Sequence, residues 1–233
     1  NGLYTKIMRN RPQGTMALLE DIAVPMEKLG GVCTDLQELF DKHHYDGAVI
    51  FGHAKYGNIH FLVTEDFAGE ESLNRYDQFT EDMVDLVLRE QGTLKAEHGT
   101  GRIMSPFVQR QYGDDLYQAM VDVKDACDPN RILNPGTIIT DDPQLHLKYI
   151  KPTETVRDII DDCVECGYCE PVCPSQHLTT TPRQRIVIQR AIAACEASGA
   201  YDLAERLKAQ EVYDVVQTCA VDGMCQTACP VNI

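Results

Sequence analysis

The chain lacks tryptophan, and its basic residues are too few to balance the acidic ones. Lysine and arginine number 21 against 36 aspartate and glutamate, so the formal net charge is −15. No basic stripe appears along the sequence, which argues against nucleic acid or an anionic membrane surface as a partner. Long apolar runs are absent too: the longest, residues 47–51, is far shorter than the about 20 residues of a membrane-spanning helix. We therefore expect a soluble protein with no transmembrane segment.

Cysteine, in contrast, is plentiful, and seven of the ten cysteines lie in two similar runs. The first run, C-x2-C-x2-C-x3-C-P, contains Cys163, Cys166, Cys169 and Cys173. This spacing is typical of an iron–sulfur cube, with the fourth cysteine reaching a second cluster. Zinc prefers two separated C-x2-C pairs, and a long acidic chain without a signal peptide gives disulfides little support. We predict iron–sulfur clusters, which require a reducing compartment such as the cytoplasm.

The second run has the same spacing except at its second position. It contains Cys219, Cys225 and Cys229, with Asp222 where the first run has Cys166. We expect the pairing to cross over between the runs. One cluster would be held by Cys163, Cys166, Cys169 and Cys229, and the other by Cys173, Cys219 and Cys225. The remaining cysteines, Cys33, Cys127 and Cys195, are expected to be buried small apolar residues.

Asp222 leaves the type of the second cluster open. A carboxylate can ligate iron, which would complete a [4Fe-4S] cluster with one oxygen ligand. A missing thiolate could equally leave a [3Fe-4S] cluster with three cysteines, and the third alternative is a solvated loop aspartate beside Gly223.

The pattern of apolar residues predicts two domains. Residues 1–142 read as an α+β domain with helices at 33–44, 71–91 and 114–127 and strands at 48–52 and 58–64. Residues 143–155 are polar and contain proline, which indicates a linker. Residues 156–233 form the cluster domain, with two helices between the cysteine runs, opened by Pro182 and separated at Gly199. This arrangement resembles the all-helical ferredoxin domain of succinate dehydrogenase iron–sulfur subunits, a resemblance that implies a [3Fe-4S] cluster at the second run.

A second group of candidate site residues lies in the α+β domain. Residues that face each other across a hairpin lie about 5 Å apart at Cβ, so His53 and His60 could bind one ion. In an extended segment Glu97 and His98 would point to opposite faces, so one could bind the metal while the other acts on a substrate. Taken alone the pattern is weak, and the alternative is hydrogen-bonded core histidines with a surface glutamate.

Three motifs in this domain resemble a known family. The segments FGHAKYGNIHF, LKAEHGTGR and DPNRILNPGTII are similar to the C-terminal part of FAD-linked D-2-hydroxyacid dehydrogenases of the vanillyl-alcohol-oxidase type, over residues 3–139. The resemblance implies a divalent metal (Zn, Fe or Mn) on His53, His60 and Glu97, with His98 as the base. It also implies substrate contacts for Asn58 and Arg9 and an approach of Asn134 to the flavin.

Some positions depart from the family pattern, and they leave the substrate undecided. Tyr56 replaces the usual aspartate of the family's G-H-x-G-D-G-N pattern, and Gln13 and Leu19 stand where a threonine and a lysine accompany the arginine. No glycine-rich pyrophosphate loop is present in residues 1–26. We therefore expect most of the FAD site to lie outside this chain.

Together these features predict a fragment of a FAD- and iron–sulfur-dependent dehydrogenase that oxidises D-lactate or D-2-hydroxyglutarate. The chain has no start signal and stops just after a cluster ligand. We therefore expect an internal fragment with a truncated cluster domain, and we expect this fragment to be inactive by itself. Electrons would pass from FAD to the clusters and on to a quinone or a redox protein. The expected location is the cytoplasm, and attachment to the inner face of the membrane as a peripheral protein is left open. The alternatives are an electron-transfer module that docks on a partner flavoprotein, and a structural zinc protein.

Overall fold

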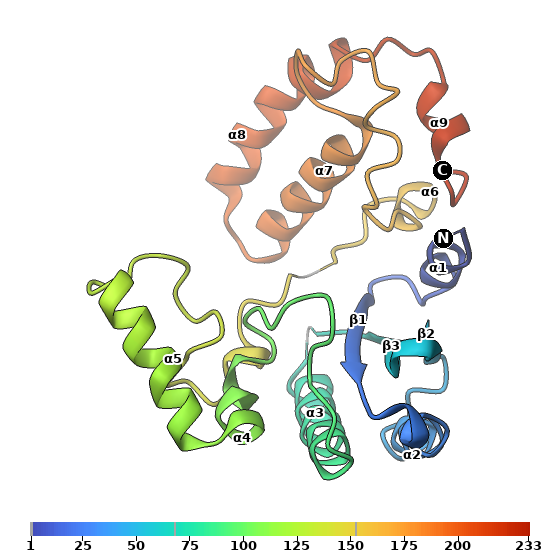
Figure 1. The fold of residues 1–233 in the computed structure, drawn as a ribbon. Coiled ribbons are helices and arrows are strands. Elements are labelled where there is room, and N and C mark those ends of the chain that lie inside the picture. Colours follow the sequence, from blue (N-terminus) through green and yellow to red (C-terminus); the bar gives the residue numbers. More distant parts are fainter. Residues whose placement is uncertain (1, 68, 152) are drawn as a thin grey trace. The chain divides into compact units, whose positions relative to one another are not determined.

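The computed structural model describes residues 2–67, 69–151 and 153–233, which divide into two compact units. The larger unit is Ala17–Lys151, and the smaller combines Asn1–Met16 with Pro152–Ile233 (Figure 1). The expected linker, 143–155, overlaps both units. Leu145 and His146, at its start, are buried in a short helical turn of the larger unit.

The larger unit is built on a three-stranded sheet in the order β1-β3-β2. β2 (Val49–His53) and β3 (Asn58–Glu65) form an antiparallel hairpin, confirming the two predicted strands. β1 (Met16–Ala23) was not predicted from the sequence. Its end lies beside the start of β3, because Val24 N–H donates to the carbonyl of Gly57.

Gly57 is required where the hairpin meets the end of β1. Its φ of +64° lies in the left-handed region, and an added Cβ would lie 2.0 Å from the carbonyl oxygen of Val24. Only glycine tolerates both conditions. The hairpin that carries His53 and His60 is therefore held in place by this residue.

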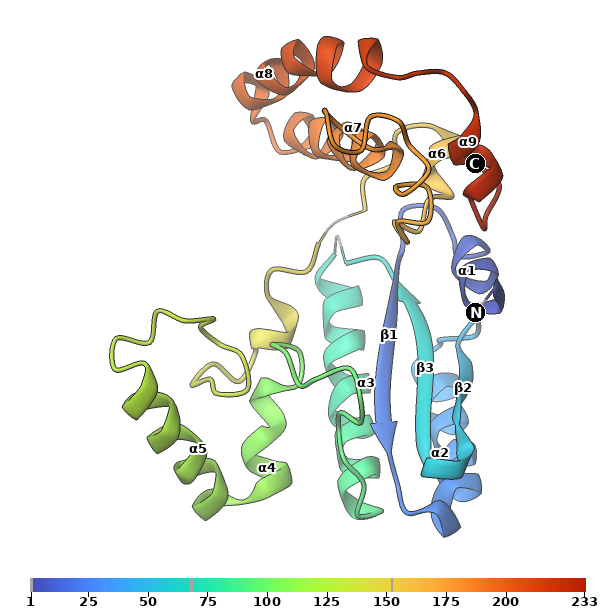
Figure 2. The ribbon, with the colours of Figure 1, turned by 45° about the horizontal axis from the view of Figure 1, so that its top comes forward.

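Helices α2 (Leu29–Lys42) and α3 (Glu70–Arg89) pack on one face of the sheet (Figure 2). Three aromatic rings, one from each element, meet there: Phe40 and Phe61 lie 5.6 Å apart between centroids, and Phe61 and Phe79 lie 6.0 Å apart. Since side chains alternate along a strand, the neighbours of Phe61 point to the opposite face. His60 and Asn58 therefore lie on the face away from these helices.

The remaining elements of the larger unit follow the sheet along the chain. A predicted helix is confirmed at α5 (Asp114–Cys127). Cys127, at its end, is exposed, so the expectation that it is a buried apolar residue was wrong; Cys33 and Cys195 are partly buried. The shorter elements are η1 (Met26–Lys28), η2 (Ala54–Tyr56), η3 (Ser105–Phe107), α4 (Val108–Tyr112) and η4 (Leu145–Leu147).

The smaller unit is helical, and its two main helices lie between the cysteine runs as predicted. α7 (Pro182–Ala197) begins with a capping box between Thr181 and Gln184, which satisfies donors at the helix start. Gly199, at φ +78°, separates it from α8 (Tyr201–Glu211). The other elements are α1 (Gly2–Arg9), α6 (Asp158–Asp161), the π-helical turn η5 (Val212–Gln217) and α9 (Met224–Ala228). Within the described residues, no helix has both the length and the apolar character needed to cross a membrane.

Candidate metal centre and cluster sites

Three side chains converge on the open face of the sheet. Glu97 Oε1 lies 3.0 Å from His60 Nε2 and 3.5 Å from His53 Nε2. Donors placed 2.0–2.2 Å from a tetrahedral ion are roughly 3.4 Å from one another. Two imidazole nitrogens and one carboxylate oxygen are a common ligand set for zinc and related ions. The three residues thus fit a divalent metal in both spacing and chemistry.

The hairpin places the two histidines differently from the simple facing arrangement that the sequence suggested. His53 pairs with Asn58, and His60 pairs with Phe51. The two histidines are therefore diagonal neighbours on one face, and their ring centroids lie 5.3 Å apart. A diagonal pair still brings long side chains together.

The segment that carries Glu97 and His98 is a bend, so the expectation of an extended segment with opposed side chains was wrong. The two side chains approach the same point: His98 Nε2 lies 3.8 Å from Glu97 Oε1. The His98 ring stacks on the His60 ring at 4.8 Å with an interplanar angle of 8°. A carboxylate ligand and an imidazole base can thus act on one bound molecule from the same side.

Asp21 is the site residue that sequence reasoning missed. Its side chain is 0% exposed, and its Oδ2 accepts the backbone N–H groups of Ala96, Glu97 and His98 at 3.1, 2.6 and 2.8 Å. Its Oδ1 accepts the side-chain amide of Asn58 at 2.8 Å. Burial alone would raise the pKa of Asp21, but these hydrogen bonds outweigh it and the pKa is lowered. The group is therefore a carboxylate at neutral pH.

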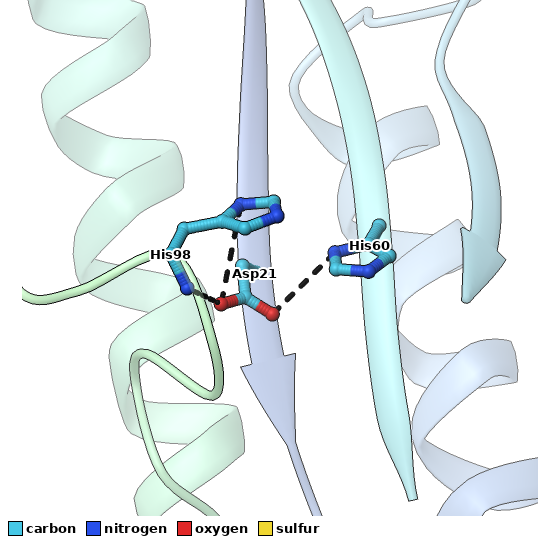
Figure 3. Close-up of side chains that lie close together, drawn as sticks. All are labelled: Asp21, His60 and His98. Carbon is cyan, nitrogen blue, oxygen red and sulfur yellow. Dashed lines mark hydrogen bonds and ion pairs between the residues drawn. The ribbon is translucent and has the colours of Figure 1, made fainter. Parts of the chain in front are cut away.

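Asp21 also approaches two histidine rings. Its Oδ1 lies 3.4 Å from His60 Nδ1, and its Oδ2 lies 4.0 Å from His98 Nδ1 (Figure 3). These three residues form a second set of converging donor atoms. Both oxygens of Asp21 already accept N–H groups, however, so few lone pairs remain for an ion. The donor chemistry favours His53, His60 and Glu97 as the metal ligands and Asp21 as their support.

Two further predicted site residues of the larger unit are Asn58, which is bonded to Asp21, and Asn134. Asn58 is buried, and its Oδ1 has no hydrogen-bond partner among the described residues. Asn134 lies in a loop at φ +47° and lines an apolar groove of about 930 Å³ beside α5. Exposed Leu116 and Val123 of α5 line the same groove.

Arg9 belongs to the smaller unit. Its Nε donates to Asp162 at 3.2 Å, and its side chain remains 40% exposed. A role for Arg9 in substrate binding stays a prediction.

The first cluster site is assembled from both cysteine runs. The predicted set, Cys163, Cys166, Cys169 and Cys229, lines one cavity. Cys225, which we expected at the second cluster, lines the same cavity. Two sulfurs already accept backbone N–H groups, Cys163 from Glu165 at 3.4 Å and Cys229 from Ile233 at 3.5 Å. Burial raises the pKa of the Cys163 and Cys169 thiols, so these groups keep their protons until a metal displaces them. The donor set fits an iron–sulfur cluster.

The second site is indicated by contacts beside its ligands. The hydroxyl of Ser175, two residues after Cys173, donates to the carbonyl of Thr218, which precedes Cys219. Thr179 and Thr218 are joined by a hydroxyl hydrogen bond of 2.7 Å. These bonds bring the end of the first run to the start of the second, as the crossed pairing requires.

Two arginines, buried Arg190 and half-buried Arg11, support the first run. Arg190 Nη2 and Arg11 Nη2 donate to the carbonyl of Cys163 at 3.1 and 3.2 Å. Arg190 also pairs with Glu165 at 2.7 Å. Burial, and secondarily the neighbouring Arg190 charge, lower the pKa of Arg11. The cysteine loop is thus held by side chains from two distant parts of the sequence.

Asp222 is exposed and accepts the backbone N–H of Met224 at 3.2 Å. This bond caps the turn before α9 and does not use the second carboxylate oxygen. The arrangement is compatible with each of the roles that the sequence left open.

A change of Asp222 to cysteine tests whether this position faces the second cluster. If the aspartate leaves an iron position open, Asp222→Cys should convert a [3Fe-4S] EPR signal of the oxidised protein into a [4Fe-4S] signal seen only after reduction. Asp222→Asn is the matched control, because it keeps the shape of the turn without adding a thiolate. Identical spectra for the wild type and Asp222→Cys in both redox states would show that position 222 does not face a cluster.

Comparison with known proteins agrees with these two sites. Residues 5–138 match the family described as "FAD linked oxidases, C-terminal domain", and residues 159–233 match the "4Fe-4S dicluster domain". The first match covers more than half of the chain. The chain therefore belongs to the FAD-linked oxidases, and it joins their C-terminal domain to a two-cluster iron–sulfur domain. The predicted α+β domain followed by a helical ferredoxin domain is confirmed.

Individual relatives extend this assignment. Glycolate oxidase subunit GlcD of Bacillus subtilis is 30% identical over 54% of this chain and 26% of its own length. D-lactate dehydrogenase [cytochrome] of Arabidopsis thaliana is 30% identical over 54% of the chain and 22% of its own length. D-2-hydroxyglutarate dehydrogenase of Escherichia coli is 24% identical over 92% of the chain and 26% of its own length. The chain thus spans about a quarter of these relatives.

Proposed function

We propose that this chain is the substrate-binding and electron-transfer part of a D-2-hydroxyacid dehydrogenase that uses FAD and iron–sulfur clusters. The enzyme would oxidise D-lactate or D-2-hydroxyglutarate to the 2-oxo acid. The observation that carries the proposal is the convergence of His53, His60, Glu97 and His98 on one face, in a chain that also has two cluster sites. The similarity to D-2-hydroxyglutarate dehydrogenases across 92% of the chain supports the same arrangement.

The side chains divide the work on the substrate. His53, His60 and Glu97 would hold a divalent ion (Zn, Fe or Mn) that binds the 2-hydroxyl and carboxylate and lowers the hydroxyl pKa. His98, whose Nε2 lies 3.8 Å from Glu97, would take the hydroxyl proton, because a neutral imidazole accepts protons near neutral pH. Asn58, whose buried Oδ1 has no hydrogen-bond partner among the described residues, would contact the substrate. Arg9 would pair with a substrate carboxylate.

The remaining chemistry belongs to the redox groups. FAD, when bound, would supply the acceptor for a hydride (two electrons and one proton) from substrate C2 and would pass the electrons on singly. Asn134 would lie near the flavin. Two clusters, one [4Fe-4S] and either a [3Fe-4S] or an Asp-ligated [4Fe-4S], would carry electrons to a quinone or a redox protein. We place the enzyme in the cytoplasm, and attachment to the inner face of the membrane as a peripheral protein is an open alternative.

Substrate reduction of the redox groups tests this function. In the enzyme that joins this chain to its FAD-binding domain, an anaerobic addition of D-lactate or D-2-hydroxyglutarate should bleach the flavin band and then reduce the clusters. The L enantiomers are the matched control and should cause neither change. Bleaching only after addition of a separate flavoprotein, with no divalent ion bound at the histidines, would favour the docking module instead.

A further inference from the structure

Asp21 is unusual because it is a fully buried carboxylate whose hydrogen-bond donors are neutral. Its four hydrogen bonds come from three backbone N–H groups and the amide of Asn58. The partly buried lysine nearby, Lys95, pairs with Glu20 at 2.5 Å instead. A buried anion costs free energy, so a carboxylate held this way is retained for what it organises.

One oxygen of Asp21 organises the bend. Three successive N–H groups, from Ala96 to His98, point to Oδ2 within 3.1 Å. This contact fixes the backbone of both Glu97 and His98 against β1. A single atom, Asp21 Oδ2, therefore fixes the position of both Glu97 and His98 relative to the sheet.

The other oxygen faces His60. His60 is 6% exposed, and its Nδ1 has no hydrogen-bond partner among the described residues, yet Asp21 Oδ1 lies only 3.4 Å away. A carboxylate in this place stabilises a proton on Nδ1, which leaves the lone pair on Nε2. His60 Nε2 is the atom that points to Glu97 Oε1 at 3.0 Å. The tautomer that Asp21 favours is thus the one that a metal ligand needs.

We propose that Asp21 is the positioning residue of the metal centre, setting the tautomer of His60 and the placement of Glu97 and His98. The inference rests on the proposed metal centre and deepens it. Asp21 acts through the residues it holds and does not itself bind the ion. Loss of such a supporting partner lowers metal affinity by about 10–100-fold.

Metal affinity measures this role directly. Zn²⁺ dissociation constants, from competition with a chromophoric chelator, should be about 10–100-fold weaker for Asp21→Asn than for the wild-type chain. Glu20→Gln is the matched control, since Glu20 is the neighbouring buried carboxylate on β1 but pairs with Lys95. Its Zn²⁺ affinity should stay within twofold of that of the wild type, with circular dichroism showing that both variants are folded.

A measurement on the wild-type chain tests the same inference without requiring that a variant folds. Nitrogen-15 NMR of the histidine rings should show His60 protonated at Nδ1, with Nε2 shifted by added Zn²⁺. A proton on His60 Nε2 would overturn the inference, as would Asp21→Asn binding Zn²⁺ within twofold of the wild type. Failure of the wild-type chain to bind Zn²⁺ at His53, His60 and Glu97 would overturn the proposed metal centre itself, and the inference with it.

Discussion

Replacing His98 by alanine is expected to lower turnover by about 10²–10⁴-fold, the usual effect of losing a general base, in the enzyme that joins this chain to its FAD-binding domain. Metal content should be unchanged, because the proposed ligands are His53, His60 and Glu97. The bend should also persist, since Asp21 binds the backbone N–H of His98, which alanine retains. Steady-state kinetics with the D-hydroxy acid, together with metal analysis, checks both expectations.

Variants of the proposed metal ligands should behave differently from His98→Ala. Glu97→Ala, His53→Ala and His60→Ala should lower metal content and raise the substrate concentration needed for half-maximal rate, because each removes a donor to the same ion. Loss of metal from His98→Ala, with metal and activity retained in Glu97→Ala, would reverse the two roles. If none of the four changes affected metal or turnover, the docking module would be the better description.

The second large effect concerns the crossing of the cysteine runs. Anaerobically prepared protein should contain about seven or eight irons, as one [4Fe-4S] cluster plus a [3Fe-4S] or a second [4Fe-4S] cluster requires. Cys229→Ser should remove about four of them, although Cys163, Cys166 and Cys169 remain in place, because Cys229 completes their set. Iron analysis and EPR of the reduced protein measure this loss.

Two further cysteine changes make the test specific. Cys173→Ser should instead affect the second cluster and leave the [4Fe-4S] signal of the first. Cys127→Ser, an exposed cysteine of the larger unit, should leave the iron content unchanged. Uncrossed pairing would appear as the reverse pattern, with Cys173→Ser removing the signal of the first run. Stoichiometric zinc without iron in the wild type would rule out the clusters altogether.

Much of the fold could be predicted because its signals are local. The helix at Asp114–Cys127 follows from helical spacing, and the break at Gly199 follows from the φ that glycine permits. β1 was missed because two adjacent acidic residues, Glu20 and Asp21, interrupt its apolar stretch. In the structure both are buried and bonded on opposite faces of the strand. Two acidic residues inside an apolar run could have indicated a strand with buried, hydrogen-bonded carboxylates.

The identities of the site residues could be predicted more fully than the backbone conformation that places them. The candidate residues His53, His60, Glu97 and His98 were identified from two short motifs, residues 51–61 and 94–102. The bend at Glu97 was not, because its backbone is bonded to Asp21, which lies 76 residues earlier in the sequence. No local preference of the segment encodes that contact, so an extended conformation was the natural but wrong expectation.

The bond between Arg11 and the carbonyl of Cys163 has a consequence for biosynthesis. These residues are 152 positions apart, and the whole larger unit is made between them. The ribosome adds about 5–20 residues per second, so Cys163 is synthesised roughly 8–30 s after Arg11. The larger unit can fold in that interval. A folded unit shortens the flexible chain between Arg11 and Cys163, which lowers the entropy cost of closing the contact between them. We therefore expect the loop of the first cysteine run to become protected from hydrogen exchange after the sheet, with the segment around Arg11 docking on it last.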